Sequence, residues 1–414
     1  MGSRTAGSTA RGPALLAAAC ALALFGATGR LGAESRSFEL PAPPGIDARA
    51  VVLIDFAKGE VLYANNADEA IPPASLTKIM TMHVAMDAVD RGDLRLDDIV
   101  VIRKEETSLP YGSSLMYLQP GMKVPFDDLL RGMAVISGND AAFAVARVLA
   151  GSSDSFAELM NRAARDMGLG VTRFVEPSGL SEENLTTARE MAILSRNYLL
   201  AHPEAIEAYH SRTTMEFPRA EVMPEGVAPP HIKILLRNRN DLLFSYAGCD
   251  GLKTGFIRES GSNLVVTAER EGTRFILVTL GGANGSAARK RGATQLLDWA
   301  FANWKTVEPG IPALPMVKLW SGAKGQIRVA AAEEARFTVP RAWSEGIQAR
   351  IELPGEIDAP VAAGSAVGRI VYTSGERVLR RVDIVAAEEG ELGSFFVRLR
   401  DAIIRFFSRV FTQK

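Results

Sequence analysis

Apolar residues follow two different spacings along the chain. Four short runs rich in Val, Ile and Leu are joined in pairs by glycine-containing turns, which is typical of β-hairpins. From residue 75 to about residue 208, apolar residues recur three and four positions apart, which predicts helices. The predicted strands are residues 50–56 and 60–63 before this helical region, and residues 263–268 and 274–280 after it.

Strands on both sides of a helical region suggest one sheet, whose terminal strands come together while the helices cover it. A domain boundary is predicted near residues 306–315, where three prolines within seven residues stop a continuing helix. Residues 316–390 then alternate short β-type runs with turn residues, which predicts a small all-β domain. This stretch contains neither histidine nor cysteine, so we expect a spacer or contact module rather than a reaction centre.

The pattern changes again at the end of the chain, where residues 394–414 predict an amphipathic helix. Placed at 100° intervals, residues 395–411 form one narrow polar face and a broad apolar arc that only Arg400 interrupts. Most such helices dock on the protein's own core. Five phenylalanines and an arginine-rich polar face fit a helix in a membrane interface better. The polar face holds Arg398, Asp401, Arg405, Ser408 and Arg409.

Composition narrows the class of protein. A chain of 414 residues with 47% hydrophobic and 23% charged residues is ordinary for a soluble protein of two folded domains. Lys and Arg number 47 against 48 Asp and Glu, so no global positive field exists to hold nucleic acid. Two cysteines, Cys20 and Cys249, are too few for a disulfide scaffold or a four-cysteine zinc site.

The N-terminus has the pattern of a secretory signal peptide, predicted at residues 1–33. Arg4 and Arg11 precede an uncharged apolar stretch of about 14 residues, which is too short to span a bilayer. Cys20 lies in the middle of that stretch rather than at its end, which disfavours a lipoprotein. Cleavage after Ala33 would leave predicted domains at 34–305 and 306–393, followed by the terminal helix.

Candidate chemistry begins with Ser75-Leu-Thr-Lys78, which follows two prolines suited to a helix entry. Serine and lysine three positions apart share a helix face. A neutral lysine there can take the proton of the serine hydroxyl and turn it into a nucleophile. The motif alone is weak, because Ser321-Gly-Ala-Lys324 has the same spacing and a helix cap would explain Ser75 equally well.

Two further motifs follow in the chain. Ser137-Gly-Asn139 lies between an apolar run and a helical one, where serine and asparagine usually act as caps. Lys253-Thr254-Gly255 occurs once, just before the second predicted hairpin, and taken alone it fits a strand end with a surface lysine.

Together and in this order, the three motifs are the marks of penicillin-binding proteins and serine β-lactamases. The residues around them, at 73–81, 112–116, 130–141 and 250–256, closely resemble the low-molecular-mass D-alanyl-D-alanine carboxypeptidases. The resemblance runs from about residue 45 to the C-terminus. It implies an α+β fold of the β-lactamase/transpeptidase type, with an antiparallel sheet covered by helices, then a small all-β domain and a C-terminal amphipathic helix.

The resemblance also implies roles for individual residues. Ser75 would attack the carbonyl between the last two D-alanines of a peptidoglycan stem peptide, with Lys78 as general base. Ser137 would pass a proton to the departing D-alanine, and Asn139 would hold the peptide. The mature β-rich domain at 306–393 would act as a stalk.

The same resemblance implies a pocket for the substrate's terminal carboxylate, formed by Lys253, Thr254 and Gly255. The backbone N–H groups of Ser75 and Phe256 would form an oxyanion hole. Arg289 stands where the family commonly places an arginine near that carboxylate, although Arg291 lies only two residues away. No metal or cofactor is implied, β-lactams would act as inhibitors, and the helix would hold the enzyme at the outer face of the cytoplasmic membrane.

One segment departs from the family pattern, since residues 176–187 keep the asparagine of a frequent Asn-His pair and lack its histidine. A class A β-lactamase is a rival interpretation, but it needs a glutamate directly before Leu-Asn, and residues 182–185 show the reverse order. A silent peptidoglycan-binding module is the other rival. The four histidines show no metal-binding spacing, so we expect core or surface roles for His83, His202, His210 and His231.

Overall fold

The structure is a computed structural model that describes residues 40–283 and 285–412. The predicted signal peptide lies outside the described residues. The central element is a five-stranded antiparallel sheet in the order β2-β1-β9-β8-β7. Its strands are β1 (Ala50–Asp55), β2 (Val61–Asn65), β7 (Cys249–Ile257), β8 (Gly261–Arg270) and β9 (Thr273–Gly282).

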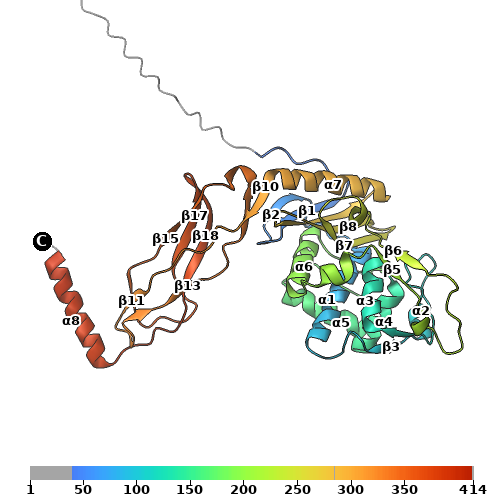
Figure 1. Cartoon of the computed structure of the whole chain (residues 1–414), viewed down its shortest axis with the longest axis horizontal. Coiled ribbons are helices and arrows are strands. Elements are labelled where there is room, and N and C mark those ends of the chain that lie inside the picture. Colours follow the sequence, from blue (N-terminus) through green and yellow to red (C-terminus); the bar gives the residue numbers. More distant parts are fainter. Residues whose placement is uncertain (1–39, 284, 413–414) are drawn as a thin grey trace, which may run out of the picture. The chain divides into compact units, whose positions relative to one another are not determined.

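The first and last of these strands meet as the sequence predicted, with Val52 of β1 opposite Val278 of β9. Successive side chains of a strand point to opposite faces, so β1 supplies two separate cores. Val51 and Leu53 pack on one face against α7 (Gly285–Asn303). Val52 and Ile54 pack on the other face, which the remaining helices of this domain cover (Figure 1).

The helical layer holds the residues between β2 and β7. Almost every side chain of α1 is buried, because α1 lies inside the layer and contacts α3, α4, α5 and α6. A helix that is surrounded on all sides lacks the polar stripe of a surface helix. The helices are α1 (Thr77–Asp90), α2 (Lys104–Thr107), α3 (Phe126–Val135), α4 (Asn139–Ala150), α5 (Ser153–Asp166) and α6 (Ala188–Ala201). Two small antiparallel strand pairs lie in the same region. In the first, β3 (Ile99–Val101) pairs with β4 (Lys123–Pro125), and in the second, β5 (Thr214–Glu216) pairs with β6 (Leu235–Arg237).

A second, all-β unit follows α7, as the sequence predicted. β10 (Trp304–Val307) directly follows α7 and pairs with β14 (Phe337–Pro340). The core of this unit is centred on Phe337, Ile370 and Tyr372. Its sheets have the orders β12-β11-β16 and β13-β18-β17-β15, built from β11 (Val317–Trp320), β12 (Gln326–Ile327), β13 (Val329–Ala331), β15 (Ile347–Glu352), β16 (Glu356–Asp358), β17 (Ala366–Ser374) and β18 (Arg377–Ala386).

The last element is the predicted amphipathic helix, α8 (Phe395–Thr412). Its polar face lies on the β-rich unit: the Asp401 carboxylate accepts a hydrogen bond of 2.8 Å from the Ser321 N–H, and Arg405 pairs with Asp358. Its apolar side chains are largely exposed, and Phe396 is 79% exposed. Among the described residues, no helix is both long enough and apolar enough to cross a bilayer.

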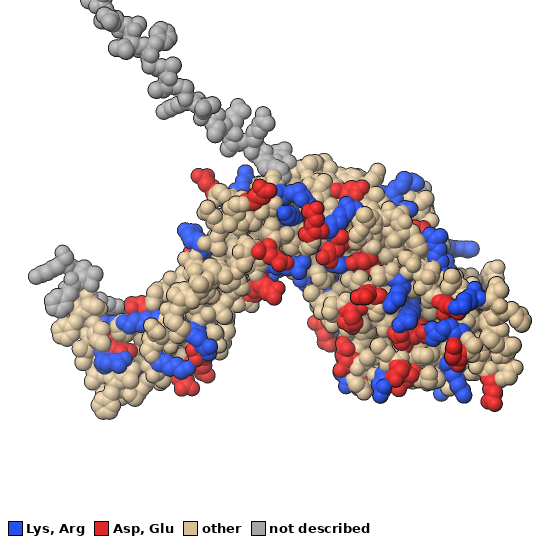
Figure 2. Space-filling view, viewed as in Figure 1, with Lys and Arg blue, Asp and Glu red and all other residues tan. Residues whose placement is uncertain are grey.

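Charged side chains of both signs are dispersed over the face of the molecule that Figure 2 draws. Figure 2 shows Lys and Arg interspersed with Asp and Glu on the face that it draws, and neither sign forms a continuous field there. This agrees with the formal net charge of −1. Long-range attraction of a polyanion is therefore not a property of this face.

Candidate active site

Ser75 lies in a tight turn at the entrance to α1. A 3-10 turn over Ala74–Leu76 leads directly into the helix, so Ser75 precedes the α-helical residues that were expected to carry it. Ala74 has a φ of +51°, a left-handed conformation that L-residues rarely adopt. Such a conformation persists only where the surroundings impose it, and it is common at functional sites.

Two glycines allow other segments to press against this turn. A Cβ on Gly179 would lie 1.9 Å from the Ala74 carbonyl oxygen. A Cβ on Gly255, in the middle of β7, would lie 2.9 Å from the Pro73 carbonyl oxygen and 3.1 Å from the Ser75 nitrogen. The loop after α5 and the edge strand of the sheet therefore contact the Ser75 turn through their backbones.

Lys78 is completely buried one helical turn after Ser75. Its Nζ lies 2.6 Å from Asn139 Oδ1, 2.6 Å from the Ser178 carbonyl oxygen and 3.2 Å from Ser75 Oγ. A neutral amine has two N–H donors and one lone pair. Asn139 and Ser178 offer only acceptors and use both donors, so the lone pair is left for the Ser75 hydroxyl.

Burial also sets the protonation state of this amine. It lowers the pKa of Lys78 to about 7, against the opposing influence of the Glu176 and Asp140 carboxylates. Among the described residues, neither of these two carboxylates forms a direct ion pair with Lys78. A substantial fraction of Lys78 is therefore neutral near pH 7 and able to accept a proton.

The second motif lies at the start of α4, where Asn139 is the first helical residue. Ser137 has a φ of +66° and is 4% exposed, and its Oγ has no hydrogen-bond partner within the described structure. Asp140 accepts hydrogen bonds from the Met116 and Leu118 N–H groups at 2.8 and 3.0 Å. Asp140 thus fixes the segment that carries Gly112 and Ser114 beside Ser137.

The third motif is in the interior of β7 rather than at a strand end. Lys253 is 1% exposed, and its Nζ donates to the Thr254 carbonyl oxygen at 3.0 Å. Burial, followed by the positive charges of Lys78, Arg239 and Arg289, lowers the pKa of Lys253 well below its ordinary value. An anion bound near these groups would raise the pKa of Lys253, because it would stabilise the ammonium form.

All three motifs reach one cavity of about 510 Å³, a size suited to a small ligand. Lys78, Asn139 and Lys253 are buried beside it and are not among its lining residues. Arg289 lines the cavity from α7, whereas Arg291 is exposed and does not. Other lining residues that bear on the chemistry are Ser75, Ser137, Thr254, Gly255 and Phe256.

Some residues of the site were not singled out from the sequence. Arg239 and Asp241 line the cavity from the segment before β7, and no local pattern marks them. Glu176 accepts hydrogen bonds from the N–H groups of Ser178 and Gly179 at 2.7 and 2.6 Å, and so positions the carbonyl that Lys78 contacts. The Glu-Pro-Ser-Gly run containing Glu176 was the only available signal.

Asn184, the asparagine retained from the Asn-His pair, also supports this loop. It is fully buried, donates to Glu176 Oε1 at 2.8 Å and accepts from the Val175 N–H at 2.7 Å. Glu182 and Glu183 beside it are exposed. Asn184 therefore stabilises the loop that positions Ser178.

A second hollow of about 500 Å³ lies near the other end of α1. Asp90, Asp127 and Asp128 line it together with Arg131 and Arg219, and Arg131 pairs with Asp127 at 2.6 Å while Arg219 pairs with Asp128. The hollow has almost the same volume as the first but no serine, threonine or lysine in its lining. The chemistry of the lining residues, not the volume, identifies the candidate active site.

Two histidines, His210 and His231, and the cysteine Cys249 lie outside the candidate active site. His210 is buried between Tyr198 and the Leu252 carbonyl, and burial lowers its pKa to about 3. His231 is exposed. Cys249 begins β7, and burial raises the pKa of its thiol to about 12, so it is not a reactive thiolate.

Comparisons with known proteins agree with these observations. Residues 38–284 match the Peptidase S11 family, described as D-alanyl-D-alanine carboxypeptidase. Residues 313–391 match the C-terminal domain of penicillin-binding protein 5. The chain is 36% identical over 377 residues to the D-alanyl-D-alanine carboxypeptidase DacC of Escherichia coli (strain K12), covering 89% of this chain and 90% of that protein.

Solved structures are similar over the same region. The crystal structure of penicillin-binding protein 5 from Haemophilus influenzae has a TM-score of 0.74 and 31% identity, covering 85% of this chain and 100% of that one. Penicillin-binding protein D2 from Listeria monocytogenes in its cefotaxime-bound form has a TM-score of 0.54 and 30% identity, covering 63% and 100%. The expected antiparallel sheet, helical layer and all-β domain are thereby confirmed.

The contact between Gly179 and the Ser75 turn leads to a stability prediction. Gly179 and Gly168 have similar φ values of +85° and +75°, but a Cβ on Gly168 would meet nothing within 4 Å. Gly168→Ala should cost about 1 kcal/mol of unfolding free energy because of its backbone conformation alone. Gly179→Ala should cost several times more, since its methyl group would overlap the Ala74 carbonyl. Urea unfolding measures both, and equal losses would contradict the close packing described here.

Proposed function

Because the chain belongs to the D-alanyl-D-alanine carboxypeptidase family, we propose that Ser75 is the nucleophile that removes the terminal D-alanine from peptidoglycan stem pentapeptides. Ser75 Oγ attacks the carbonyl between the last two D-alanines, and its bond to that carbon replaces the bond to the departing amine. Water then attacks the acyl-enzyme and releases the shortened peptide. The observation that carries this proposal is the buried lysine amine 3.2 Å from the Ser75 hydroxyl.

Lys78 is the general base of the first step. Its two acceptor partners leave one lone pair for the serine proton, and burial brings its pKa to about 7. A base with a pKa near the working pH combines a useful neutral fraction with enough basicity to take the proton. Lys78 as an ammonium ion then holds the proton that the leaving amine requires.

Ser137 delivers that proton to the leaving group. Its hydroxyl lines the cavity beside Ser75 and has no partner in the described structure, so it is free to accept from one group and donate to another. Asn139 holds Lys78 through its Oδ1, and its amide nitrogen can donate to the peptide backbone. The backbone N–H groups of Ser75 and Phe256 stabilise the oxyanion, in keeping with the close approach of β7 to the Ser75 turn.

The terminal carboxylate of the substrate binds at the two cations that line the cavity, with the buried amine of Lys253 beside them. Lys253, Arg239 and Arg289 lie close enough for their charges to interact, and Asp241 is the one acidic residue among those lining the cavity. Thr254 and Gly255 complete this wall from β7. A carboxylate placed there relieves repulsion among the cations, which is the electrostatic basis of selection for a free C-terminus.

The β-lactamase alternative has less support. Class A enzymes use a glutamate to activate water for hydrolysis. Here Glu182 and Glu183 are exposed, and the Glu176 carboxylate is occupied with backbone N–H groups. A silent binding module is also disfavoured, because the Ser75–Lys78–Asn139 contacts are those needed for proton transfer.

We also propose that α8 holds the enzyme on the outer face of the cytoplasmic membrane after secretion, with the β-rich unit as a stalk. The polar face of α8 is engaged by Ser321 and Asp358, while Phe395, Phe396 and Phe406 are 63%, 79% and 65% exposed. A row of exposed aromatic side chains beside arginines fits the boundary between acyl chains and anionic headgroups.

Replacement of the nucleophile is the direct test of the reaction. Ser75→Ala should abolish covalent labelling by a fluorescent penicillin and lower D-alanine release from a stem pentapeptide by several orders of magnitude, because no acyl-enzyme forms. Ser321→Ala is the matched control, since Ser321 belongs to the other Ser-x-x-Lys sequence. Labelling that survives in Ser75→Ala but is lost in Ser321→Ala would reverse the assignment.

The carboxylate pocket predicts discrimination between two substrates that differ in one group. The peptide acid should be cleaved roughly a hundredfold faster than the C-terminal amide, because the amide carries no charge to pair with the cations. Arg289→Ala should reduce this ratio, and Arg291→Ala should leave it unchanged, since Arg291 is exposed outside the cavity. Equal rates on acid and amide would remove Lys253 and Arg289 from this role.

Vesicle sedimentation tests the membrane proposal on a chain lacking residues 1–33. Replacing Ile403, Phe406 and Phe407 by serine should release the protein from anionic vesicles without changing D-alanine release from small peptides, because apolar burial drives the attachment. Ile232→Ser is the control, since Ile232 is 77% exposed but lies far from α8 in the sequence. Binding should weaken with salt without vanishing. Full sedimentation of the triple variant would contradict the proposal.

A further inference from the structure

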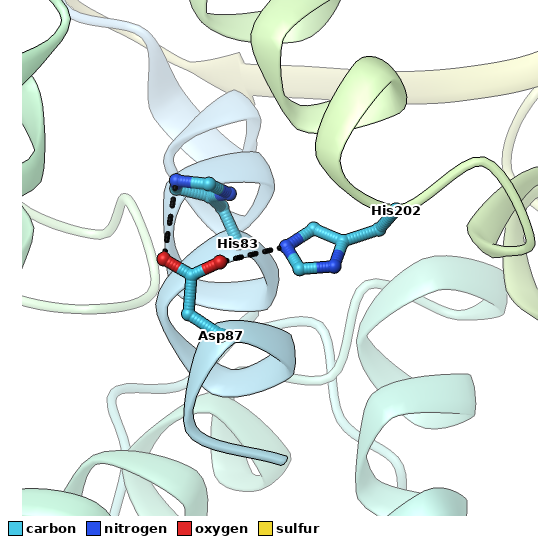
Figure 3. A group of neighbouring side chains, drawn as sticks. All are labelled: His83, Asp87 and His202. Carbon is cyan, nitrogen blue, oxygen red and sulfur yellow. Dashed lines mark ion pairs between the residues drawn. The ribbon is translucent and has the colours of Figure 1, made fainter. Parts of the chain in front are cut away.

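Two histidines and an aspartate meet at the end of α1 that lies away from Ser75. His83 and Asp87 are one turn apart on α1, and His202 follows the last residue of α6 (Figure 3). His83 Nε2 lies 3.5 Å from Asp87 Oδ2, and His202 Nε2 lies 3.0 Å from Asp87 Oδ1. One ligand atom from each residue lies within 4.8 Å of the other two.

These imidazoles lack ordinary hydrogen bonds. His202 is 1% exposed, yet neither of its ring nitrogens has a hydrogen-bond partner in the part of the chain that the structure describes. Nε2 lies 3.0 Å from Asp87 Oδ1 and Nδ1 lies 3.1 Å from Asp90 Oδ2, and these contacts are ion pairs when the ring is protonated. His83 Nδ1 is unpartnered as well. Buried polar atoms are nearly always satisfied, so this arrangement calls for an explanation.

We propose that His83, Asp87 and His202 bind a divalent transition-metal ion of the Zn²⁺ type. Imidazole nitrogen and carboxylate oxygen are common zinc ligands, and tetrahedral zinc at its usual bond lengths spaces them by roughly 3.4 Å. The separations of 3.5 and 3.0 Å run from the two histidines to different oxygens of Asp87, and one ligand atom from each residue lies within 4.8 Å of the other two, so a small adjustment of the side chains brings them to this spacing. Water would occupy the fourth position, because the Asp87 side chain is 38% exposed and opens the site to solvent.

A neighbouring carboxylate supports the assignment. The second ring nitrogen of His202, Nδ1, lies 3.1 Å from Asp90 Oδ2. Histidines that bind a metal through one nitrogen usually present the other N–H to a carboxylate, which orients the ring and makes it a better ligand. Asp90 is therefore assigned as the positioning residue for His202.

The ion would stabilise the fold and take no part in peptide cleavage. His83 is five residues after Lys78, which is about 8 Å along the helix axis, and the side chains of the site lie further on. A metal ion would tie the second half of α1 to the end of α6. This inference goes beyond the proposed function and does not depend on it.

Zinc titration of the chain lacking residues 1–33, in competition with a chromophoric chelator, tests the proposal. One Zn²⁺ should bind per chain and raise the melting temperature by a few degrees. His83→Gln and His202→Gln should each abolish stoichiometric binding. Asp90→Asn should weaken it about 10- to 100-fold, as removal of a second-sphere carboxylate does elsewhere. His231→Gln, which changes an exposed histidine, should bind as the unaltered chain does.

Two further measurements keep the result interpretable. Penicillin labelling of each variant shows that the fold is retained, because the Ser75 site lies elsewhere on α1. The Co²⁺ absorption spectrum of the unaltered chain reports nitrogen and oxygen ligation without any substitution. Absence of stoichiometric Zn²⁺ binding to the unaltered chain would overturn the proposal, as would full binding by the folded His83→Gln and His202→Gln variants.

Discussion

The burial of one amine, Lys78, without a direct ion-pair partner governs the candidate active site. Desolvation penalises a buried ammonium ion, and the hydrogen bonds to Asn139 and Ser178 and the charges of the Glu176 and Asp140 carboxylates offset only part of this cost. These two acceptors come from the start of α4 and from the loop after α5. Both elements must therefore be correctly placed before Ser75 can become a nucleophile.

Several neighbouring residues hold the segments around Ser75 and Lys78 in position. Glu176 and Asn184 fix the loop that carries Ser178, and Asp140 fixes the segment beside Ser137. Gly179 and Gly255 let two backbones press against the Ser75 turn. Ala74 and Ser137 hold left-handed conformations that the chain would not adopt alone. Strain at such positions is maintained by packing, and it positions the reacting groups before substrate arrives.

Local patterns predicted much of this arrangement, because the relevant information is itself local. Hairpin spacing gave the pairs β1–β2 and β8–β9, and helical periodicity gave the amphipathic character of α8. The order of three short motifs was enough to indicate the family, which the comparisons confirm. The roles of Ser75, Lys78 and Ser137 remain predictions.

The features that were missed depend on contacts between distant segments. β7 was not predicted as a strand, because Gly251 and Gly255 interrupt its apolar pattern, and the Lys-Thr-Gly motif taken alone fitted a strand end with a surface lysine. The structure places Lys253 in the buried middle of that strand. His83 and His202 are 119 positions apart in the numbering and show no metal-binding spacing, yet α1 and α6 bring them together. Arg239 likewise reaches the cavity from a segment without a motif.

The central claim is that Lys78 is neutral enough near pH 7 to act as a base, and direct titration of its amine tests it. NMR of lysine labelled at the ε position, with the Lys78 signal assigned by its absence in Lys78→Arg, gives the pKa in the unliganded enzyme. A midpoint near 7 is predicted, with the rate of penicillin acylation falling about tenfold per pH unit below it, because protonation removes the lone pair. A midpoint near 10, the ordinary value for lysine, would contradict the account.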